Sequence, residues 1–219
     1  MNKMVDIVGE TGLKFFGKIS ASISHELKNA LSIINESAGL LEDLTLMAQK
    51  GAPIDPARLQ TTAKRIQQQV GRADQIIQNM NRFSHSIDRA LHMVDMDELM
   101  GLFTAVTRRI SDMRGIKVSY VPCASPVTIT TSPFFLKTLL WHLLDLAMGS
   151  AGEGKTVKLT VEKVQNTVEI RFGHLAALTA EPSSCFPGES EAALISALDA
   201  TVSITADSMV LAVPCGSGY

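Results

Sequence analysis

The sequence predicts an α+β protein with two domains, a helical hairpin over residues 1–92 and a small α/β sandwich over residues 93–219. Two observations lead to this prediction. In the first segment apolar residues recur every three or four positions, which places them on one side of a helix. In the second segment short runs that alternate between apolar and polar residues are interspersed with helical patterns. Helices mixed with antiparallel strand pairs are typical of an α+β layered domain.

The first predicted helix extends from Phe15 to about Lys50. Gly51, Pro53 and Pro56 follow it, and proline cannot continue a helix because it lacks an N–H and clashes with the preceding turn. The helix therefore ends before this segment. Its apolar stripe consists of Phe16, Ile19, Ile23, Leu27, Ala30, Ile34, Ala38, Leu41 and Ala48.

A second helix is predicted from Pro56 to about residue 92, with Asp55 as its N-cap and Pro56 in the first helical position. Each helix would be about 50 Å long at ~1.5 Å per residue. A hairpin of this length buries only part of its two stripes, so we expect a homodimer in which two hairpins form a four-helix bundle. The second stripe consists of Leu59, Ala63, Ile66, Val70, Ala73, Ile77, Met80, Ile87 and Leu91.

The second domain is predicted as a series of short elements. Gln165 and Asn166 separate two alternating runs, which is a hairpin signature. Pro182, Pro187 and Gly188 mark a loop over residues 179–188. The predicted helices cover 95–113, 134–148 and 189–198, and the predicted strands cover 116–120, 127–130, 157–161, 168–172, 202–204 and 209–213.

The composition argues against several classes of protein. A formal net charge of −2 over 219 residues argues against a nucleic-acid binder, because such proteins neutralise phosphates with excess positive charge. No apolar run reaches the ~20 residues of a membrane span. Cys123, Cys185 and Cys215 match no metal-ligand spacing and indicate reduced thiols of a cytoplasmic protein. The charged fraction of 19% is low, which indicates that apolar surface is buried in an oligomer interface.

His25 is the candidate catalytic residue. At about 100° per residue it lies roughly 200° from Ile23, and so faces away from the apolar stripe. A neutral imidazole has a free nitrogen lone pair that can accept a phosphoryl group, whereas the alternative is an ordinary surface histidine. Glu26 could orient the ring or take its proton, and Asn29, one turn away, could hold a water molecule. The same face carries the small or polar residues Lys18, Ala21, Ser22, Lys28 and Ser32.

The residues around His25 resemble the H-box of two-component sensor histidine kinases. The resembling segment is 15–29, with a His-Glu-x-x-Asn pattern at its end. Further along the chain, residues 94–99 are similar to the family's bridge between domains, and residues 135–144 are similar to the start of its N-box helix. The resemblance extends from about Phe15 to Pro214.

This resemblance implies a helical hairpin that dimerises into a four-helix bundle, followed by a GHKL-type ATPase-like domain. It implies that His25 carries the phosphoryl group and that Glu26 is its acid/base neighbour. Asn29 occupies the position that the family links to dephosphorylation of response regulators. The receiver domain of a response regulator would then bind on the face formed by Lys18, Ala21, Ser22, Lys28 and Ser32.

The parts of the family pattern that bind Mg-ATP are altered in this chain. Leu146 stands where the N-box has an asparagine that holds the metal, and leucine has no oxygen for a hard cation. Residues 173–177 contain no acid where the family has one that reads adenine. Glu189 and Glu191 stand where a glycine-rich turn would bind phosphates, and they would repel an anion. We therefore expect a degenerate domain that binds neither nucleotide nor metal.

Two further patterns suggest nucleotide sites that we do not favour. Asp145 or His174 could provide a shifted ATP site. Residues 149–156 match the P-loop pattern, but a helix leads into them and a strand leads out, which reverses the P-loop geometry. The histidines to which we assign no chemistry are His85 and His92, expected near the end of the second helix, and His142, expected in the core or an interface.

The sequence therefore predicts a histidine phosphotransfer protein of a phosphorelay. His25 would accept a phosphoryl group from the aspartate of one receiver domain and pass it to another without ATP, and Mg²⁺ is expected on the receiver and not on this chain. One alternative is an active histidine kinase core with ATP-dependent autophosphorylation and response-regulator phosphatase activity. The other is a non-catalytic dimeric adaptor. The expected partners are a second copy of the chain and receiver domains, with no nucleic acid and no membrane.

Overall fold

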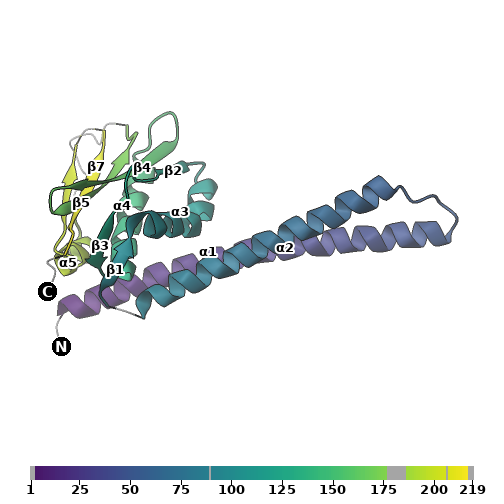
Figure 1. The fold of residues 1–219 in the computed structure, drawn as a ribbon, viewed down its shortest axis with the longest axis horizontal. Coiled ribbons are helices and arrows are strands. Elements are labelled where there is room, and N and C mark those ends of the chain that lie inside the picture. The colour runs from purple at the N-terminus through teal and green to yellow at the C-terminus, as the bar shows by residue number, and fades with distance from the viewer. Residues whose placement is uncertain (1–2, 89, 177–185, 206, 217–219) are drawn as a thin grey trace. The chain divides into compact units, whose positions relative to one another are not determined.

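A computed structural model describes residues 3–88, 90–176, 186–205 and 207–216 (Figure 1). Contacts between residues divide the chain into two compact units. The helical unit comprises residues 20–81, and the sandwich unit comprises the residues up to Ile19 together with those from Arg82 onward. This division by contacts differs from the functional division at residue 92, which stays a prediction. Most of the loop predicted over 179–188 lies outside the described residues, as does Cys185.

Helix α1 (Lys3–Gln49) has residues in both units. The prediction that it begins near Phe15 was wrong, because its first turns are stabilised by contacts within the sandwich unit. Val8 and Thr11 are buried there, and the Thr11 hydroxyl donates a hydrogen bond to Ser190 Oγ at 3.1 Å. Tertiary packing therefore extends the helix beyond the stripe that the sequence shows.

Helix α2 (Pro56–Ser84) begins as predicted, since the backbone N–H of Ala57 donates to the Asp55 carboxylate at 2.9 Å. It ends at Ser84, so the prediction that it extends to about residue 92 was wrong. A short 3-10 helix, η1 (His85–Ile87), follows it, and the chain then enters strand β1 (His92–Asp95). Pairing of β1 with strand β3 (Thr128–Thr131) replaces the helical hydrogen bonds, so His92 lies in a strand and not in a helix.

The main sheet of the sandwich unit has five strands in the order β2-β4-β5-β7-β6. Only β2 and β4 are parallel, and the other pairs are antiparallel. The predicted hairpins around Gln165 and between the last two strands are confirmed. The strands are β2 (Lys117–Val121), β4 (Thr156–Val164), β5 (Thr167–Gly173), β6 (Thr201–Ile204) and β7 (Met209–Pro214).

Three helices complete this unit and cover one face of the sheet (Figure 1). They are α3 (Met96–Met113), α4 (Pro133–Gly149) and α5 (Glu189–Ala197). Burial alternates along β4 and β5, so that one face of the sheet is apolar and packed. Helix α4 is buried on nearly all sides and forms the centre of the core. Its fully buried leucines are Leu136, Leu139, Leu140, Leu143 and Leu144.

The P-loop pattern over residues 149–156 connects the end of α4 to the start of β4. As predicted, a helix leads in and a strand leads out, so the segment is a connection and not a phosphate-binding loop. None of the helices in the described part of the chain is long and apolar enough to cross a membrane.

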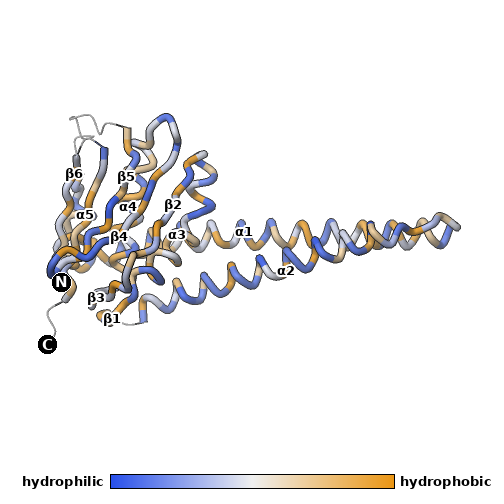
Figure 2. Tube along the Cα trace, turned by 45° about the horizontal axis from the view of Figure 1, so that its top comes forward, coloured by the Kyte–Doolittle hydropathy of each residue, from blue (hydrophilic) through white to orange (hydrophobic). Residues whose placement is uncertain are grey.

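In a single chain the helical unit leaves large apolar side chains exposed. Apolar and polar positions alternate along both helices (Figure 2), but α1 and α2 cover only part of the apolar ones. An uncovered apolar surface of this kind is typical of a helix face that packs on a further helix. The exposed residues are Leu31, Leu46, Met47, Val70 and Ile77.

Replacing Phe83 by alanine is expected to lower the free energy of unfolding by about 3–5 kcal/mol. The Phe83 ring is fully buried, and its centroid lies 5.5 Å from that of Phe15 and 6.2 Å from that of Phe134. Denaturant unfolding measures the change. Met113→Ala is the control, because Met113 is 72% exposed, and it should cost less than about 0.5 kcal/mol. Equal losses in the two variants would contradict a core role for Phe83.

Candidate functional site

His25 lies exposed on α1 within the helical unit. The residues that hold this part of the helix in place are Ile23 and Ala30, which are 5% and 0% exposed. Because they occupy the opposite side of α1, the imidazole faces solvent, as the helical spacing predicts. The ring is therefore accessible to a partner without any rearrangement of the fold.

Glu26, the next residue along the chain, makes its contact across the hairpin. Its carboxylate Oε2 lies 3.8 Å from Nη2 of Arg72 on α2, and its side chain is only 17% exposed. The ion pair holds the carboxylate on the side of α1 that faces α2. A role of Glu26 in orienting the His25 ring or taking its proton stays a prediction.

The polar face around His25 agrees with the prediction at most of its positions. Asn29 and Lys28 are exposed, as are Ala21 and Ser32. No large side chain of this set shields the imidazole, and the set offers an ammonium, an amide and a hydroxyl to a partner. Exposed small and polar side chains therefore surround the imidazole.

Two members of the predicted face behave differently. Ser22 was expected on the exposed face, but it is 7% exposed and its hydroxyl has no hydrogen-bond partner among the described residues. The prediction was wrong because Ser22 lies about 100° from Ile23, at the border of the apolar stripe, where the hairpin covers it. Lys18 is exposed but belongs to the sandwich unit, where its Nζ lies 4.4 Å from the centroid of the Trp141 ring.

His142 joins two helices of the sandwich unit. Its Nδ1 lies 2.5 Å from Oε1 of Glu191, and both side chains are largely buried, at 25% and 18% exposed. The pair could not be predicted from the sequence because its two residues are far apart in the chain. The sequence showed only that the segment forming α5 begins with acidic residues. The pair connects α4 to the first turn of α5, where the family resemblance would place bound phosphates.

Asp145 and His174, the two residues that could provide a shifted ATP site, differ in their contacts. Asp145 forms an ion pair with Arg114 at 2.7 Å, and His174 is exposed with a positive φ of 66°. Within the described ranges, no group of three or more His, Cys, Asp or Glu side chains is arranged to hold a metal ion. That the sandwich unit binds neither nucleotide nor metal stays a prediction.

Asp97, Tyr120 and Cys123 form a polar cluster that the sequence did not reveal. The Tyr120 hydroxyl and the Cys123 backbone N–H both donate to the Asp97 carboxylate, which lowers the pKa of Asp97. Burial and the same hydrogen bond raise the pKa of Tyr120, and burial raises that of the Cys123 thiol. The cluster fixes the segment after β2 to α3, and a thiol with a raised pKa is unsuited to nucleophilic chemistry.

A family model covers the segment that contains His25. Residues 17–94 match the His Kinase A (phospho-acceptor) domain. This segment is similar to the His Kinase A domain family. Among curated proteins, no relative matches the chain.

Several solved structures resemble the chain at low identity. The Acinetobacter baumannii histidine kinase AdeS has 15% identity and a TM-score of 0.49, over 88% of this chain and 98% of that one. The histidine kinase ThkA, in complex with the response regulator TrrA, has 15% identity and a TM-score of 0.47, over 93% and 63%. A bacterial phosphotransferase has 13% identity and a TM-score of 0.44, over 90% and 94%. Likenesses this weak carry no argument about activity.

The His Kinase A segment extends beyond the helical unit. It includes α2 to its end at Ser84, the 3-10 helix η1 and most of β1. His25 lies near its N-terminal end, on the exposed face of α1. The accessible imidazole thus lies within the segment that matches the phospho-acceptor domain.

Ser22→Ala in this segment is expected to leave the free energy of unfolding unchanged or to raise it by about 1 kcal/mol. The reason is that the buried hydroxyl has no partner, so its desolvation is not repaid. Ser37→Ala is the matched control on the same helix, because Ser37 is 1% exposed and its hydroxyl donates to the Ile33 carbonyl at 2.7 Å. Thermal or denaturant unfolding of the whole chain compares the two. A larger loss from Ser22→Ala than from Ser37→Ala would show that Ser22 has a partner in solution.

Proposed function

We propose that this chain is a two-component phosphotransfer protein in which His25 exchanges a phosphoryl group with aspartates of receiver domains. The observation that carries the proposal is that an exposed imidazole lies in a segment of the phospho-acceptor domain family. Phosphotransfer needs an accessible nucleophile before it needs any other group. His25 satisfies this requirement without a conformational change.

In the proposed step the lone pair of the unprotonated ring nitrogen of His25 attacks the phosphorus of an aspartyl phosphate. A P–N bond forms while the P–O bond to the aspartate breaks, and the carboxylate leaves with that electron pair. The remaining ring proton becomes acidic, and Glu26 is the proposed acceptor. The receiver supplies Mg²⁺ and its acidic cluster, so this chain contributes only the imidazole and its neighbours. The reverse reaction passes the group to a second receiver.

The face around His25 is the proposed receiver-binding surface. Ala21 leaves space beside the imidazole, and Lys28 and Ser32 can pair with acidic or polar groups of the partner. Asn29, one turn from His25, is the proposed group that positions water for loss of the phosphate. The part of Lys18 in this face stays a prediction, because its described contact is with Trp141.

A homodimer is part of the proposal. His Kinase A domains dimerise through their hairpins, and the helical unit of this chain exposes Leu31, Val70 and Ile77, at 59%, 53% and 48%. Packing two such hairpins into a four-helix bundle would bury these side chains and leave His25 accessible. The cytoplasmic location expected from the cysteines stays a prediction.

We further propose that the transfer proceeds without ATP. Leu146 offers no metal ligand, and the ion pair of His142 with Glu191 occupies the surfaces that would have to receive phosphates. A carboxylate in the first turn of α5 repels an anion at that helix end. In this proposal the sandwich unit does not bind ATP, and it stabilises the protein or contacts the receiver.

The second candidate is an active histidine kinase core. The family comparison favours it, because the matched domain family is named for kinases. In that case the sandwich unit binds Mg-ATP and transfers its γ-phosphoryl group to His25. The two candidates share His25 and differ only in the phosphoryl donor.

Transfer from a labelled phosphorylated receiver tests the shared claim. Wild-type protein is expected to take up the label, and His25→Ala is expected to lower the rate by about 10³-fold or more, because no other group supplies the nucleophile. His174→Asn is the matched control, since His174 is also exposed and asparagine tolerates its positive φ. Equal labelling of His25→Ala and wild type would contradict His25 as the acceptor, and no labelling of either would favour the non-catalytic adaptor.

Titration with a fluorescent Mg-ATP analogue separates the two donors. We expect no saturable binding, and no label on His25 after incubation with labelled Mg-ATP, in a preparation that accepts label from the receiver. That preparation serves as the control for folding. Saturable binding together with ATP-derived label on His25 would overturn the ATP-independent proposal and establish the kinase core.

A further inference from the structure

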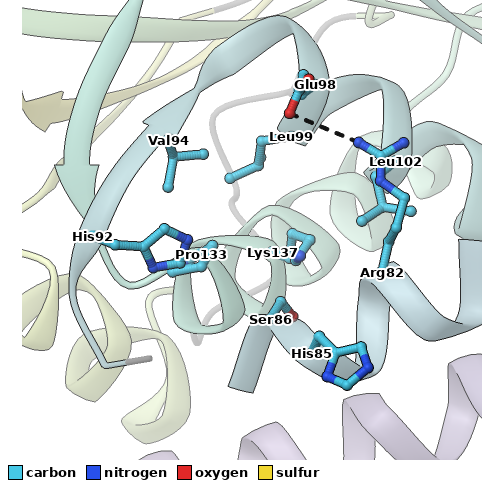
Figure 3. A pocket seen from close by; sticks show the side chains of 10 residues that line it. All are labelled: Arg82, His85, Ser86, His92, Val94, Glu98, Leu99, Leu102, Pro133 and Lys137. Atoms are coloured by element: carbon cyan, nitrogen blue, oxygen red, sulfur yellow. Dashed lines mark ion pairs between the residues drawn. The ribbon is translucent and has the colours of Figure 1, made fainter. Parts of the chain in front are cut away.

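The sandwich unit contains a cavity of about 300 Å³ that has no part in the proposed transfer (Figure 3). It lies where the end of α2 and η1 meet β1 and the first turns of α3 and α4. It is separate from the His142–Glu191 pair, neither member of which lines it. The lining residues are Arg82, His85, Ser86, His92, Val94, Glu98, Leu99, Leu102, Pro133 and Lys137.

Lys137 is the unusual member of this lining. It is 2% exposed, yet among the described residues its ammonium has no hydrogen bond and no ion pair. Its described contact is with the ring of Phe83, whose centroid lies 5.7 Å from Nζ. A buried ammonium without a counter-ion is costly, and such groups are ordinarily paired. What exposure the residue retains is toward the cavity that it lines.

A second buried group in the cavity also lacks a partner. His92 Nδ1 is inaccessible to solvent and forms no hydrogen bond with any described residue. The hydroxyl of Ser86, by contrast, already donates to the Phe83 carbonyl at 2.6 Å. The His92 nitrogen is enclosed by the protein, so Lys137 of α4 and Arg82 of α2 are the groups that the lining offers to a ligand.

Positive charge exceeds negative charge around the cavity. Arg82, 53% exposed, lies at its edge, with Nη2 3.9 Å from Oε2 of Glu98, which is a weak pair at that distance. His85 Nδ1 is held by Asp88 at 2.7 Å. Lys137 and Arg82 together outweigh the single carboxylate of Glu98 in the lining.

We propose that this cavity binds a phosphate group, with Lys137 and Arg82 as its cationic ligands. The two groups come from α4 and α2, which suits an oxyanion that accepts hydrogen bonds from several directions. An arginine binds phosphate through its planar fork, and a lysine binds it as a point charge. The ligand is a free phosphate or a small phosphomonoester, either of which fits within the cavity.

The protonation of Lys137 gives this site a characteristic pH dependence. Burial and the charge of Arg82 lower the pKa of Lys137 to about 8. The other ionisable groups that line the cavity are His85, His92 and Glu98. Above this pKa the ammonium of Lys137 in the free protein loses its proton and with it the positive charge that attracts the anion. Affinity for phosphate therefore decreases as pH rises from 7 to 9.

Titration of the full chain with inorganic phosphate, followed by amide NMR at constant ionic strength with chloride as the reference anion, tests the proposal. Saturable shifts are expected at residues of η1 and β1. Lys137→Met should weaken binding by about tenfold or more and remove the decrease above pH 8, and Arg82→Gln should weaken it several-fold. Lys117→Met and Arg108→Gln are the matched controls, because both residues are exposed in the same unit and lie outside the lining.

A parallel titration with glycerol phosphate distinguishes the two sources of the group. Tighter binding than that of inorganic phosphate assigns the cavity to a phosphomonoester, and equal or weaker binding assigns it to free phosphate. If Lys137→Met does not fold, Arg82→Gln still tests the site. Shifts that never saturate, or saturable binding that both lining variants leave unchanged, overturn the proposal. Because His25 has no part in these measurements, their outcome is independent of the phosphotransfer proposal.

Discussion

The packing of apolar side chains between α1 and α2 determines which residues of the helical unit are exposed. A helix of this kind is stable in water only when one face is packed, so Ile23 and Ala30 must lie against the hairpin partner. His25 and Asn29, which lie between them in the sequence, are then fixed on the opposite side of the same turns. His25 is exposed for this reason, and its accessibility follows from packing on the other face of the helix. A change in the register of the stripe would bury the imidazole.

The sandwich unit is organised around α4 in a comparable way. Its leucines fill the space beside the sheet, so the helix is an element of the core along almost its whole length. Leu146 continues this apolar character at a position where a nucleotide-binding relative would need a polar ligand. On the same helix, His142 Nδ1 lies 2.5 Å from the Glu191 carboxylate.

Local signals in the sequence were sufficient for most elements. Periodicity gave the helical hairpin and the strand pairs, and Asp55 followed by Pro56 gave the start of α2. The errors occur where distant residues decide the outcome. His92 lies in a strand and not in the expected helix because β1 pairs with β3. Ser22 is buried and not exposed because the hairpin packs over it. The Lys137 cavity and the His142–Glu191 pair were invisible for the same reason, since each joins elements far apart in the chain.

The central claim is that the phosphoryl group is carried on the imidazole of His25. The most direct test is to phosphorylate the wild-type chain from a receiver domain and to locate the group by fragmentation mass spectrometry under conditions that preserve P–N bonds. The account predicts a single acid-labile phosphate on His25. A phosphate found on another residue of the chain, or a chain that remains unmodified while the receiver loses its phosphate to water, would contradict it.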